Sequence, residues 1–269
     1  MDDIQFRIIL DRLGLSWKGY RRVRKGAKKR LGRHMQQLQC ATIEDYMSAL
    51  AESPEKLKQA KIDLAVSISR FFRDRQMWKI LESHILPNLI TREDPVLKVW
   101  SAGCSSGEEV YSLRLLWDVV QKRLGNAKEL QIWATDINPT MLARARAGVY
   151  PPGSLKDVSQ QWQSAYFSSI PDGKGAVRDF LKTGIHWDLR NVWEEEPPNE
   201  CFDLVFMRNH VLTYAREEFR GPVLAGIVER LRNNGYLVIG AHEKLPASFP
   251  FLHPDFENPM IFQKIEQPQ

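Results

Sequence analysis

The pattern of apolar and polar residues divides the chain into a helical first part and a longer part in which strands and helices alternate. From residue 4 to about residue 90 the apolar positions recur at helical spacing, beginning with Ile4, Ile8, Ile9, Leu13 and Leu15. Thr42 and Asp45 form a capping-box pattern that predicts another helix start in this block. Because the block precedes any strand pattern, we expect an all-helical domain over residues 1–90 and an α/β domain over residues 91–269.

The pattern changes over residues 96–111, where a short apolar run ends in a turn of small residues. Gly103 and Gly107 stand four apart in this turn. Apolar residues then recur at helical spacing, at Val110, Leu113, Leu116, Trp117 and Val120. This order predicts a strand, a tight turn and a helix. Glycine in such a turn lets the backbone pass close to a ligand, because no Cβ stands in the way.

Two carboxylates after the turn restrict the ligand that it suits. Gly107 is followed by Glu108 and Glu109 instead of Lys and Ser/Thr, so the pattern is not the phosphate-binding P-loop. Two acids would repel a pyrophosphate and would suit a ligand with positive charge or hydroxyl donors. S-adenosylmethionine (SAM) offers a sulfonium, an ammonium and a ribose. An ordinary strand-to-helix turn, with acids placed favourably at a helix N-terminus, explains the same residues.

A second strand is expected at Leu130–Thr135, with Asp136 at its end. In dinucleotide-binding folds an acid at this place binds ribose hydroxyls, about 20 residues past the glycine loop. The interval is longer here, which fits a full helix between the two features. Asp136 also suits the N-cap of the next helix. We favour the ribose role because the strand end and the glycine turn occur together.

Further strands are expected beyond residue 150. Residues 151–190 lose clear periodicity and contain short candidate strands at Val177–Phe180 and Ile185–Trp187. Cys201–Met207 reads as the fourth strand, with Arg208 and Asn209 at the end where open α/β sheets bind ligands. The later features are a helix stop at Asn233–Gly235, a strand at Tyr236–Gly240 and a last antiparallel strand at Met260–Phe262.

Composition narrows the class of protein. Hydrophobic residues make up 43% of the chain and charged residues 26%, as in ordinary globular proteins. No apolar run reaches the ~18 residues of a membrane span, and the acidic N-terminus lacks the order of a signal peptide. The three cysteines have no metal spacing and fit a reducing cytoplasm, with Cys104 as a small space-filler. We therefore expect a cytoplasmic protein without a metal site.

The net charge of +5 is concentrated in the segment Arg21–Arg33. This segment contains eight basic residues: Arg21, Arg22, Arg24, Lys25, Lys28, Lys29, Arg30 and Arg33. Such a cluster favours an acidic partner, either a protein or a nucleic acid. The solvated face of a helix is the alternative interpretation.

Several motifs occur together in an order that identifies a family. The turn reads Ala-Gly-Cys-Ser-Ser-Gly-Glu-Glu-Val-Tyr-Ser over residues 102–112. The other motifs are Ser69–Arg73, Ala134–Ile137, Ala147–Tyr150, Phe202–Asn209 and Gly240–Glu243. In this order, and over nearly the whole chain, the sequence resembles the CheR family, SAM-dependent methyltransferases that esterify glutamates on chemotaxis receptors.

The resemblance implies an α/β fold with three parts. The main part is a Rossmann-like class I SAM methyltransferase sheet over residues 91–269. An N-terminal all-helical domain precedes it, and its basic helix faces the acidic receptor. Residues 151–190 would form a small antiparallel β insert. In some family members this insert docks a receptor tail, but no motif in this sequence establishes that docking.

The resemblance also implies roles for single residues. Arg73 would point into the active site, where its planar fork of donors can grip a carboxylate. Tyr214 would flank the transferred methyl group, so these two residues are the catalytic candidates. The implied cofactor is SAM, with S-adenosylhomocysteine as product. The candidate cofactor-binding residues are Ser67, Ser69, Arg73, Gly103, Glu109, Asp136, Asn191, Arg208 and Asn209.

Within that set, Glu109 would hold the methionine end of SAM and Asp136 the ribose. Asn191 aligns with the family's adenine-contacting Asn, and Asp188 is a rival for this contact. The chain departs from the family where Ser67 replaces a frequent Asn and Ser69 a usual Thr. The interval from Asn209 to Tyr214 is also one residue longer than the common family text, which leaves the pose of Tyr214 and the methyl acceptor open.

The predicted activity is transfer of a methyl group from SAM to glutamate carboxylates of a protein. A carboxylate is already a nucleophile at pH 7, so the site must mainly orient the reactants. The expected partner is an acidic helical protein, such as the cytoplasmic region of a chemoreceptor, bound through Arg21–Arg33. Two rivals remain, a methyltransferase for RNA or a small molecule and a catalytically silent SAM-binding scaffold. Glu196–Asn199 does not match the box of base methylators, so nucleic acid is the less favoured partner.

Overall fold

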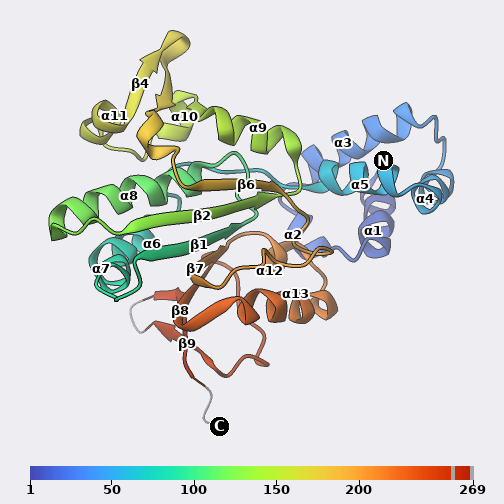
Figure 1. Cartoon of the computed structure of the whole chain (residues 1–269). Helices are drawn as coiled ribbons and strands as arrows, with labels where there is room; N and C mark the ends of the chain where they lie inside the picture. The colour runs from blue at the N-terminus through green and yellow to red at the C-terminus, as the bar shows by residue number, and fades with distance from the viewer. Residues whose placement is uncertain (256–257, 267–269) are drawn as a thin grey trace. The chain divides into compact units, whose positions relative to one another are not determined.

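The computed structural model describes residues 1–255 and 258–266, and the chain forms two compact units (Figure 1). One unit joins Met1–Val66 to Asn209–Pro222, and the other joins Ser67–Arg208 to Val223–Gln269. The domain boundary predicted near residue 90 stays a prediction. The segment 209–222, which the sequence assigns to the α/β domain, belongs by its contacts to the unit of the N-terminal helices.

The first unit is helical. The carboxylate of Asp2 caps the first helix by accepting the backbone N–H groups of Ile4 and Gln5 at 2.8 Å. The predicted capping box of Thr42 and Asp45 is confirmed at the start of a later helix. The helices are α1 (Asp3–Arg12), α2 (Trp17–Tyr20), α3 (Arg24–Gln37), α4 (Ile43–Glu52), α5 (Pro54–Leu64), α12 (Val211–Tyr214) and the first part of α13 (Glu217–Glu229).

The second unit is built on a seven-stranded sheet of order β6-β2-β1-β7-β8-β10-β9 (Figure 1). The strands are β1 (Val96–Ala102), β2 (Glu129–Asp136), β6 (Ile185–Leu189), β7 (Phe202–Met207), β8 (Leu231–Ile239), β9 (Leu252–Asp255) and β10 (Asn258–Lys264). Neighbours from β6 to β8 pair in parallel, while β10 is antiparallel to β8 and β9. The predicted α/β class is confirmed. The strand order reverses at β1, and such a reversal marks the ligand-binding crevice of open α/β sheets.

Helices lead into and separate these strands. The helices α6 (Arg75–Ile80) and α7 (Leu86–Ile90), with a π-helical turn between them, precede β1. The helix α8 (Glu108–Leu124) connects β1 to β2, and α9 (Pro139–Ala147) follows β2. The predicted apolar face of α8 is confirmed, because all five of its residues are buried. In the described part of the chain, no helix is long and apolar enough to cross a membrane.

A small antiparallel sheet follows α9. Its strands are β3 (Val149–Tyr150), β4 (Phe167–Ile170) and β5 (Lys174–Val177), in the order β3-β5-β4, with the short helices α10 (Pro152–Leu155) and α11 (Gln160–Tyr166). The predicted insert is thus present, but one of its expected strands is elsewhere. Ile185–Trp187 lies in β6 of the main sheet, where Ile185 pairs with Ile132 of β2. The other candidate strand, Val177–Phe180, is wrong beyond its first residue, because β5 ends at Val177 and Asp179–Leu181 form a short 3-10 helix.

The prediction that Asn233–Gly235 ends a helix is wrong. Helix α13 already ends at Glu229, and these residues lie inside β8. The register of β8 with β7 shifts between Phe202 and Leu204, so the extra residues form a bulge in the strand. The predicted last strand is confirmed, since Ile261 pairs antiparallel with Val238.

Candidate active site

The predicted glycine turn brings the end of β1 against the end of β2. The backbone N–H groups of Gly103 and Cys104 both donate to the carbonyl oxygen of Thr135, at 2.9 Å. Gly103 has a φ of 87°, in the left-handed region that glycine adopts without steric cost. Cys104 is buried, and burial raises the pKa of its thiol, as a space-filling role requires.

The second glycine of the turn serves helix packing. Gly107 also has a φ of 87° and directly precedes α8. A Cβ at this position would lie 2.8 Å from the Cβ of Ala145 in α9 and 3.0 Å from the hydroxyl of Tyr150. Space around Gly107 is therefore taken by neighbouring side chains, and Gly103 is the better candidate for close approach of a ligand.

Asp136 lies at the end of β2 and is tied to the glycine turn. Its carboxylate accepts the backbone N–H groups of Ser105 and Asn138, both at 2.8 Å. Asn138, and not Asp136, caps helix α9 by accepting the N–H groups of Thr140 and Met141. The N-cap interpretation of Asp136 is therefore wrong. Burial raises the pKa of Asp136 above its usual range, and the two backbone hydrogen bonds oppose that shift.

Ser105 contributes a polar group that sequence reasoning missed. Its φ of 52° is left-handed, which is uncommon for a residue other than glycine. Its Oγ is buried and has no hydrogen-bond partner among the residues that the structure describes. An unsatisfied buried hydroxyl costs about 1–3 kcal/mol. A ligand hydroxyl at the ends of β1 and β2 would satisfy this group, so the turn fits a ribose-bearing cofactor.

A buried arginine joins three parts of the second unit. Arg208, at the end of β7, has a side chain only 5% exposed. Its guanidinium donates to Glu109 Oε2 at 2.8 Å, to Asp74 Oδ2 at 2.6 Å and to the carbonyl oxygen of Arg73 at 3.0 Å. The hydroxyl of Ser101 donates to Glu109 Oε1 at 2.8 Å. We call Asp74, Glu109 and Arg208 the charge network.

The charge network carries an excess of negative charge. Two carboxylates and one guanidinium sum to a formal charge of −1. The side chains of Asp74 and Glu109 are 23% and 15% exposed, so water screens this charge only in part. The network therefore suits a small cationic group such as an ammonium. Asp74 was not among the residues predicted from the sequence, although an acidic residue directly after the candidate Arg73 could have indicated it.

Arg73 sits in a turn with an unusual backbone. Its neighbours Phe72 and Asp74 have φ values of 50° and 63°, both left-handed. Such conformations cost of order 1–3 kcal/mol each and are found often at functional sites. The guanidinium of Arg73 donates to the carbonyl oxygen of Ile68 at 3.0 Å. The Arg73 carbonyl oxygen accepts from Trp78 Nε1 at 2.9 Å as well as from Arg208.

The turn is held by its own aromatic residues and by the insert. Phe71 and Phe72 are buried, which confirms the prediction that they are anchors. The Phe71 N–H donates to the carbonyl oxygen of Ser154 in α10, and the Phe72 N–H donates to Ser112 Oγ in α8 at 3.0 Å. Asp157 forms ion pairs on both sides of the turn, with Arg70 at 2.9 Å and Arg75 at 2.5 Å.

Comparison with known proteins decides the family. The sequence model of the family described as "CheR methyltransferase, SAM binding domain" matches residues 67–254.

The chain belongs to the CheR methyltransferase family.

Three relatives show the extent of the similarity. Chemotaxis protein methyltransferase 1 of Vibrio cholerae is 33% identical over 192 residues, which are 70% of this chain and 69% of the relative. Chemotaxis protein methyltransferase 1 of Pseudomonas aeruginosa is 31% identical over 80% of each chain. The chemotaxis protein methyltransferase of Listeria monocytogenes is 29% identical over 90% of each chain. The resemblance to CheR is thus confirmed, SAM is the cofactor, and the chain is a SAM-dependent methyltransferase.

The structure of this CheR chain brings many of the predicted residues together at the carboxyl ends of β1, β2 and β7. Ser67 and Ser69 lie half-buried in the segment that leads into the Arg73 turn. Asn191 lies two residues past β6, but its side chain is tied locally, with Nδ2 donating to Glu194 at 2.7 Å. The rival Asp188 is paired with Arg190 at 2.9 Å. The adenine contact therefore stays a prediction for both.

Asn209 and Tyr214 belong to the first unit. Asn209 directly follows Arg208 and has a left-handed φ of 54°. The ring of Tyr214 lies 4.9 Å from the ring of Tyr20, centroid to centroid. His210, which directly follows Asn209 in the sequence, is half-buried, and burial of its imidazole lowers the pKa to about 4, in line with its predicted packing role. The proposed functions of Asn209 and Tyr214 stay predictions.

The predicted basic segment of this CheR chain has two kinds of residue. Arg24 and Lys28 pair with Asp3 of α1 at 3.3 and 2.8 Å. Arg30 donates to the carbonyl oxygens of Asp63 and Ala65, at the C-terminal end of α5. These three residues hold helices together. The remaining five are exposed, and we call the three of them that lie on α3 the basic face of α3: Lys25, Lys29 and Arg33, spaced four apart.

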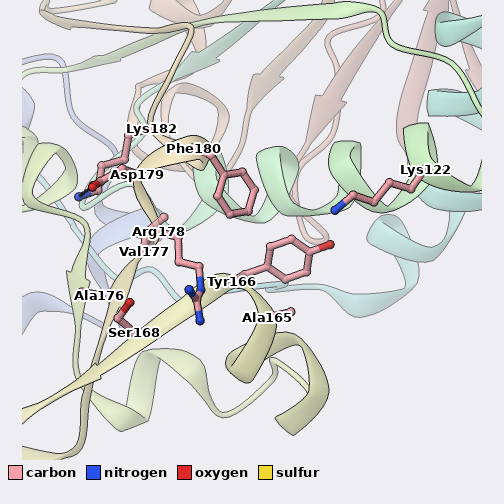
Figure 2. Close-up of a pocket in the computed structure, with 10 residues that line it drawn as sticks. All are labelled: Lys122, Ala165, Tyr166, Ser168, Ala176, Val177, Arg178, Asp179, Phe180 and Lys182. Carbon is pink, nitrogen blue, oxygen red and sulfur yellow. Dashed lines mark hydrogen bonds and ion pairs between the residues drawn. The ribbon is translucent and has the colours of Figure 1, made fainter.

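Residues of the insert, of the segment that follows it and of the C-terminal part of α8 line a hollow of about 750 Å³. Figure 2 shows the rings of Tyr166 and Phe180 and the ammonium end of Lys122 turned towards the same space. The two ring centroids lie 6.2 Å apart, and Lys122 Nζ lies 5.9 Å from the Tyr166 ring centroid. None of the predicted site residues lines this hollow.

Proposed function

We propose that this CheR-family chain transfers the methyl group of SAM to glutamate carboxylates of a chemoreceptor or a related signalling protein. The relatives that are named chemotaxis protein methyltransferases support the choice of pathway. The observation that carries the choice of substrate is the basic face of α3, because exposed cations in a row favour an acidic helical protein. The cysteine pattern supports a cytoplasmic location.

The cofactor would be held by groups at the strand ends. Asp136 and Ser105 would bind the ribose hydroxyls, since one offers a carboxylate and the other an unsatisfied hydroxyl. The charge network would bind the ammonium of the methionine end through its net negative charge. Bound SAM supplies an electrophilic methyl group. Beyond this, the reaction requires that the acceptor carboxylate is placed in line with the methyl group.

The acceptor would be oriented by Arg73. Its guanidinium donates to the carbonyl oxygen of Ile68. A substrate carboxylate could take the place of this carbonyl oxygen, because a charged acceptor forms a stronger hydrogen bond with a guanidinium. The glutamate oxygen is ionised at pH 7 and attacks without a general base, so the rate depends on alignment of oxygen, methyl and sulfur. The family resemblance assigns Tyr214 a place beside the transferred methyl.

The substrate would be recruited by the basic face of α3. Its side chains are exposed, whereas the opposite face of the same helix buries Ala27, Leu31 and His34. Exposed charges steer association over a range of about 8 Å at physiological ionic strength. A helical signalling domain rich in glutamate would match this row of cations along its length.

The test is methyl transfer to a defined protein. Purified chain and methyl-labelled SAM are incubated with the purified cytoplasmic fragment of a chemoreceptor from the same organism, and the product is treated with base. Carboxyl methyl esters release labelled methanol, whereas methyl groups on nitrogen or on RNA stay attached. Base-stable label would favour another substrate class. Binding of S-adenosylhomocysteine without any transfer would favour the silent scaffold, and either result would overturn the proposal.

A further inference from the structure

The segment that carries Tyr214 is held by the residues that precede the basic helix. Two backbone hydrogen bonds and one antiparallel β-bridge join the two stretches, in the pairs Ser16–Tyr214 (2.8 Å), Arg216–Gly14 (3.0 Å) and Leu15–Ala215. Both stretches belong to the first unit. We call residues 14–20 and 213–216 together the clamp; it includes α2 and α12, which lie next to each other in Figure 1.

Gly19 allows the two short helices of the clamp to come this close. A Cβ at Gly19 would lie 2.2 Å from the carbonyl oxygen of Thr213 and 3.1 Å from the Tyr214 ring. The nearest of these atoms is backbone, so it cannot turn aside as a flexible side chain could. Any larger residue at position 19 must therefore push α12 away from α2. Glycine is needed at position 19 for space and not for backbone conformation, because Gly19 lies in a helix and has no left-handed φ.

Tyr20 supplies the surface on which Tyr214 rests. The two rings are tilted at 56°, with centroids 4.9 Å apart. Tyr20 is 3% exposed, and its hydroxyl donates to the carbonyl oxygen of Leu64, at the end of α5, at 2.9 Å. The ring of Phe6 packs edge-on against Tyr20 at 5.9 Å. The contact surface offered to Tyr214 is therefore fixed by α1 and α5 and does not move freely.

We propose that Gly19 and Tyr20 are positioning residues for Tyr214. They hold α12 and the Tyr214 ring in one place, and they act on methyl transfer only through that tyrosine. This inference rests on the catalytic role that the proposed function gives to Tyr214. It assigns the N-terminal helical unit a second task beside recruitment of the substrate.

The clamp also places substrate recognition and the catalytic tyrosine in one body. Tyr20 is followed by a turn of three residues and then by α3, whose basic face would bind the substrate. Arg30 of α3 donates to Ala65 next to the Leu64 carbonyl that anchors Tyr20. A substrate that moves α3 would therefore move the support of Tyr214 with it.

The first experiment compares turnover of single and double variants with the receptor fragment as acceptor. Gly19→Ala should lower kcat on the order of 100-fold, because a displacement of about 1 Å can have that effect. The KM for the fragment and the affinity for S-adenosylhomocysteine should stay unchanged. Tyr20→Phe keeps the ring and should retain most of the activity, whereas Tyr20→Leu should not. In a Tyr214→Ala background, Gly19→Ala should have no further effect on kcat.

The second experiment measures how firmly the clamp is closed, independently of catalysis. Hydrogen exchange is followed at the Ser16 and Arg216 amides, which donate across the clamp. Both should exchange faster in Gly19→Ala than in the wild type. Gly221→Ala is the matched control, because Gly221 lies in α13 of the same unit and a Cβ there would meet no atom within 4 Å. It should leave both amides and kcat unchanged.

The outcomes separate the inference from the proposed function. Wild-type kcat in both Gly19→Ala and Tyr20→Leu would overturn the positioning role. So would a loss of kcat from Gly19→Ala that is equally large in the wild-type and in the Tyr214→Ala background. Unchanged exchange in Gly19→Ala would overturn the clamp itself. If Tyr214→Ala turned over at the wild-type rate while exchange still rose in Gly19→Ala, the clamp would stand and the proposed role of Tyr214 would fail.

Discussion

The charge network and the basic face of α3 use the same kinds of charged residue in opposite ways. Arg208 is 5% exposed, and its guanidinium donates to three oxygen atoms, one on Glu109 of α8 and two in the Arg73–Asp74 turn. The cations of the basic face point into water and have no such fixed geometry. Buried pairs depend on fixed partners and are weakly screened, whereas exposed charges add up and fade with salt.

This difference predicts where the chain tolerates change. Substitution of Arg208, the cation that both acids of the charge network share, leaves two unpaired carboxylates in a partly buried place. A single substitution on the basic face removes one of several similar cations. Loss of one partner should therefore be severe in the first region and mild in the second.

The largest effect is expected for Arg208→Ala. It leaves the carboxylates of Asp74 and Glu109 without their cation, and breaking a buried pair in this way costs about 3–5 kcal/mol. Urea denaturation should show a loss of this size in the free energy of unfolding. The control is Lys122→Ala, which breaks the exposed Lys122–Asp118 pair and should cost at most about 0.5 kcal/mol. Equal losses in the two variants would show that the network is not special.

Arg73→Ala should have the next largest effect, on turnover and not on folding. If its fork orients the acceptor carboxylate, kcat/KM should fall on the order of 100-fold. Arg73→Lys keeps the charge but loses the fork, so it should restore activity only in part. Each variant is assayed for methyl transfer beside its thermal midpoint. Full activity in Arg73→Ala, or a loss that follows the folded fraction, would make Arg73 a structural residue.

The sequence allowed the strand ends to be predicted because the signals there are local. The glycine turn, Asp136 and Arg208 each follow an apolar run directly, and parallel strands bring such ends to one edge of the sheet. The sequence offers two caps for α9, Asp136 and Asn138 two residues later, and both residue types suit that position. Only the hydrogen bonds of the two side chains separate these interpretations.

The partners across the chain were not predictable from local pattern. Arg208 and Asp74 are 134 positions apart, and nothing in either segment indicates the other. The same is true of the clamp. Its residues 213–216 lie within the segment 209–222, which joins the helices at the start of the chain. The strand at Ile185–Leu189 was placed in the insert because its pattern is short and its pairing with β2 is not visible in the sequence.

Asp136→Ala should weaken binding of S-adenosylhomocysteine by about 1–3 kcal/mol, if two ribose hydroxyls lose a charged acceptor. Binding should also depend on pH. Because burial raises the pKa of Asp136, the carboxylate becomes protonated at a higher pH than an exposed Asp. Wild-type affinity should therefore fall as the pH drops through that raised pKa, and the affinity of Asp136→Ala should not. Calorimetry over a pH series checks both, and parallel curves would remove Asp136 from the cofactor site.

The smallest effect is expected for single charge reversals on the basic face, such as Lys29→Glu. An exposed charge contributes about 0.2–1 kcal/mol, so the KM for the receptor fragment should rise only a few-fold at low salt. Further reversals at Lys25 and Arg33 should add to it, and added salt should reduce all these differences because it screens exposed charges.

Arg30 is not suitable for this test, because it holds the carbonyl oxygens at the end of α5 and its reversal would disturb the fold. Lys58→Glu is the matched control, since Lys58 is also exposed and lies in the same unit, but on α5. If Lys58→Glu raised KM as much as Lys29→Glu, the effect would come from net charge alone. If neither variant changed KM at low salt, the basic face would be a solvated surface, and another part of the chain would have to recognise the acceptor.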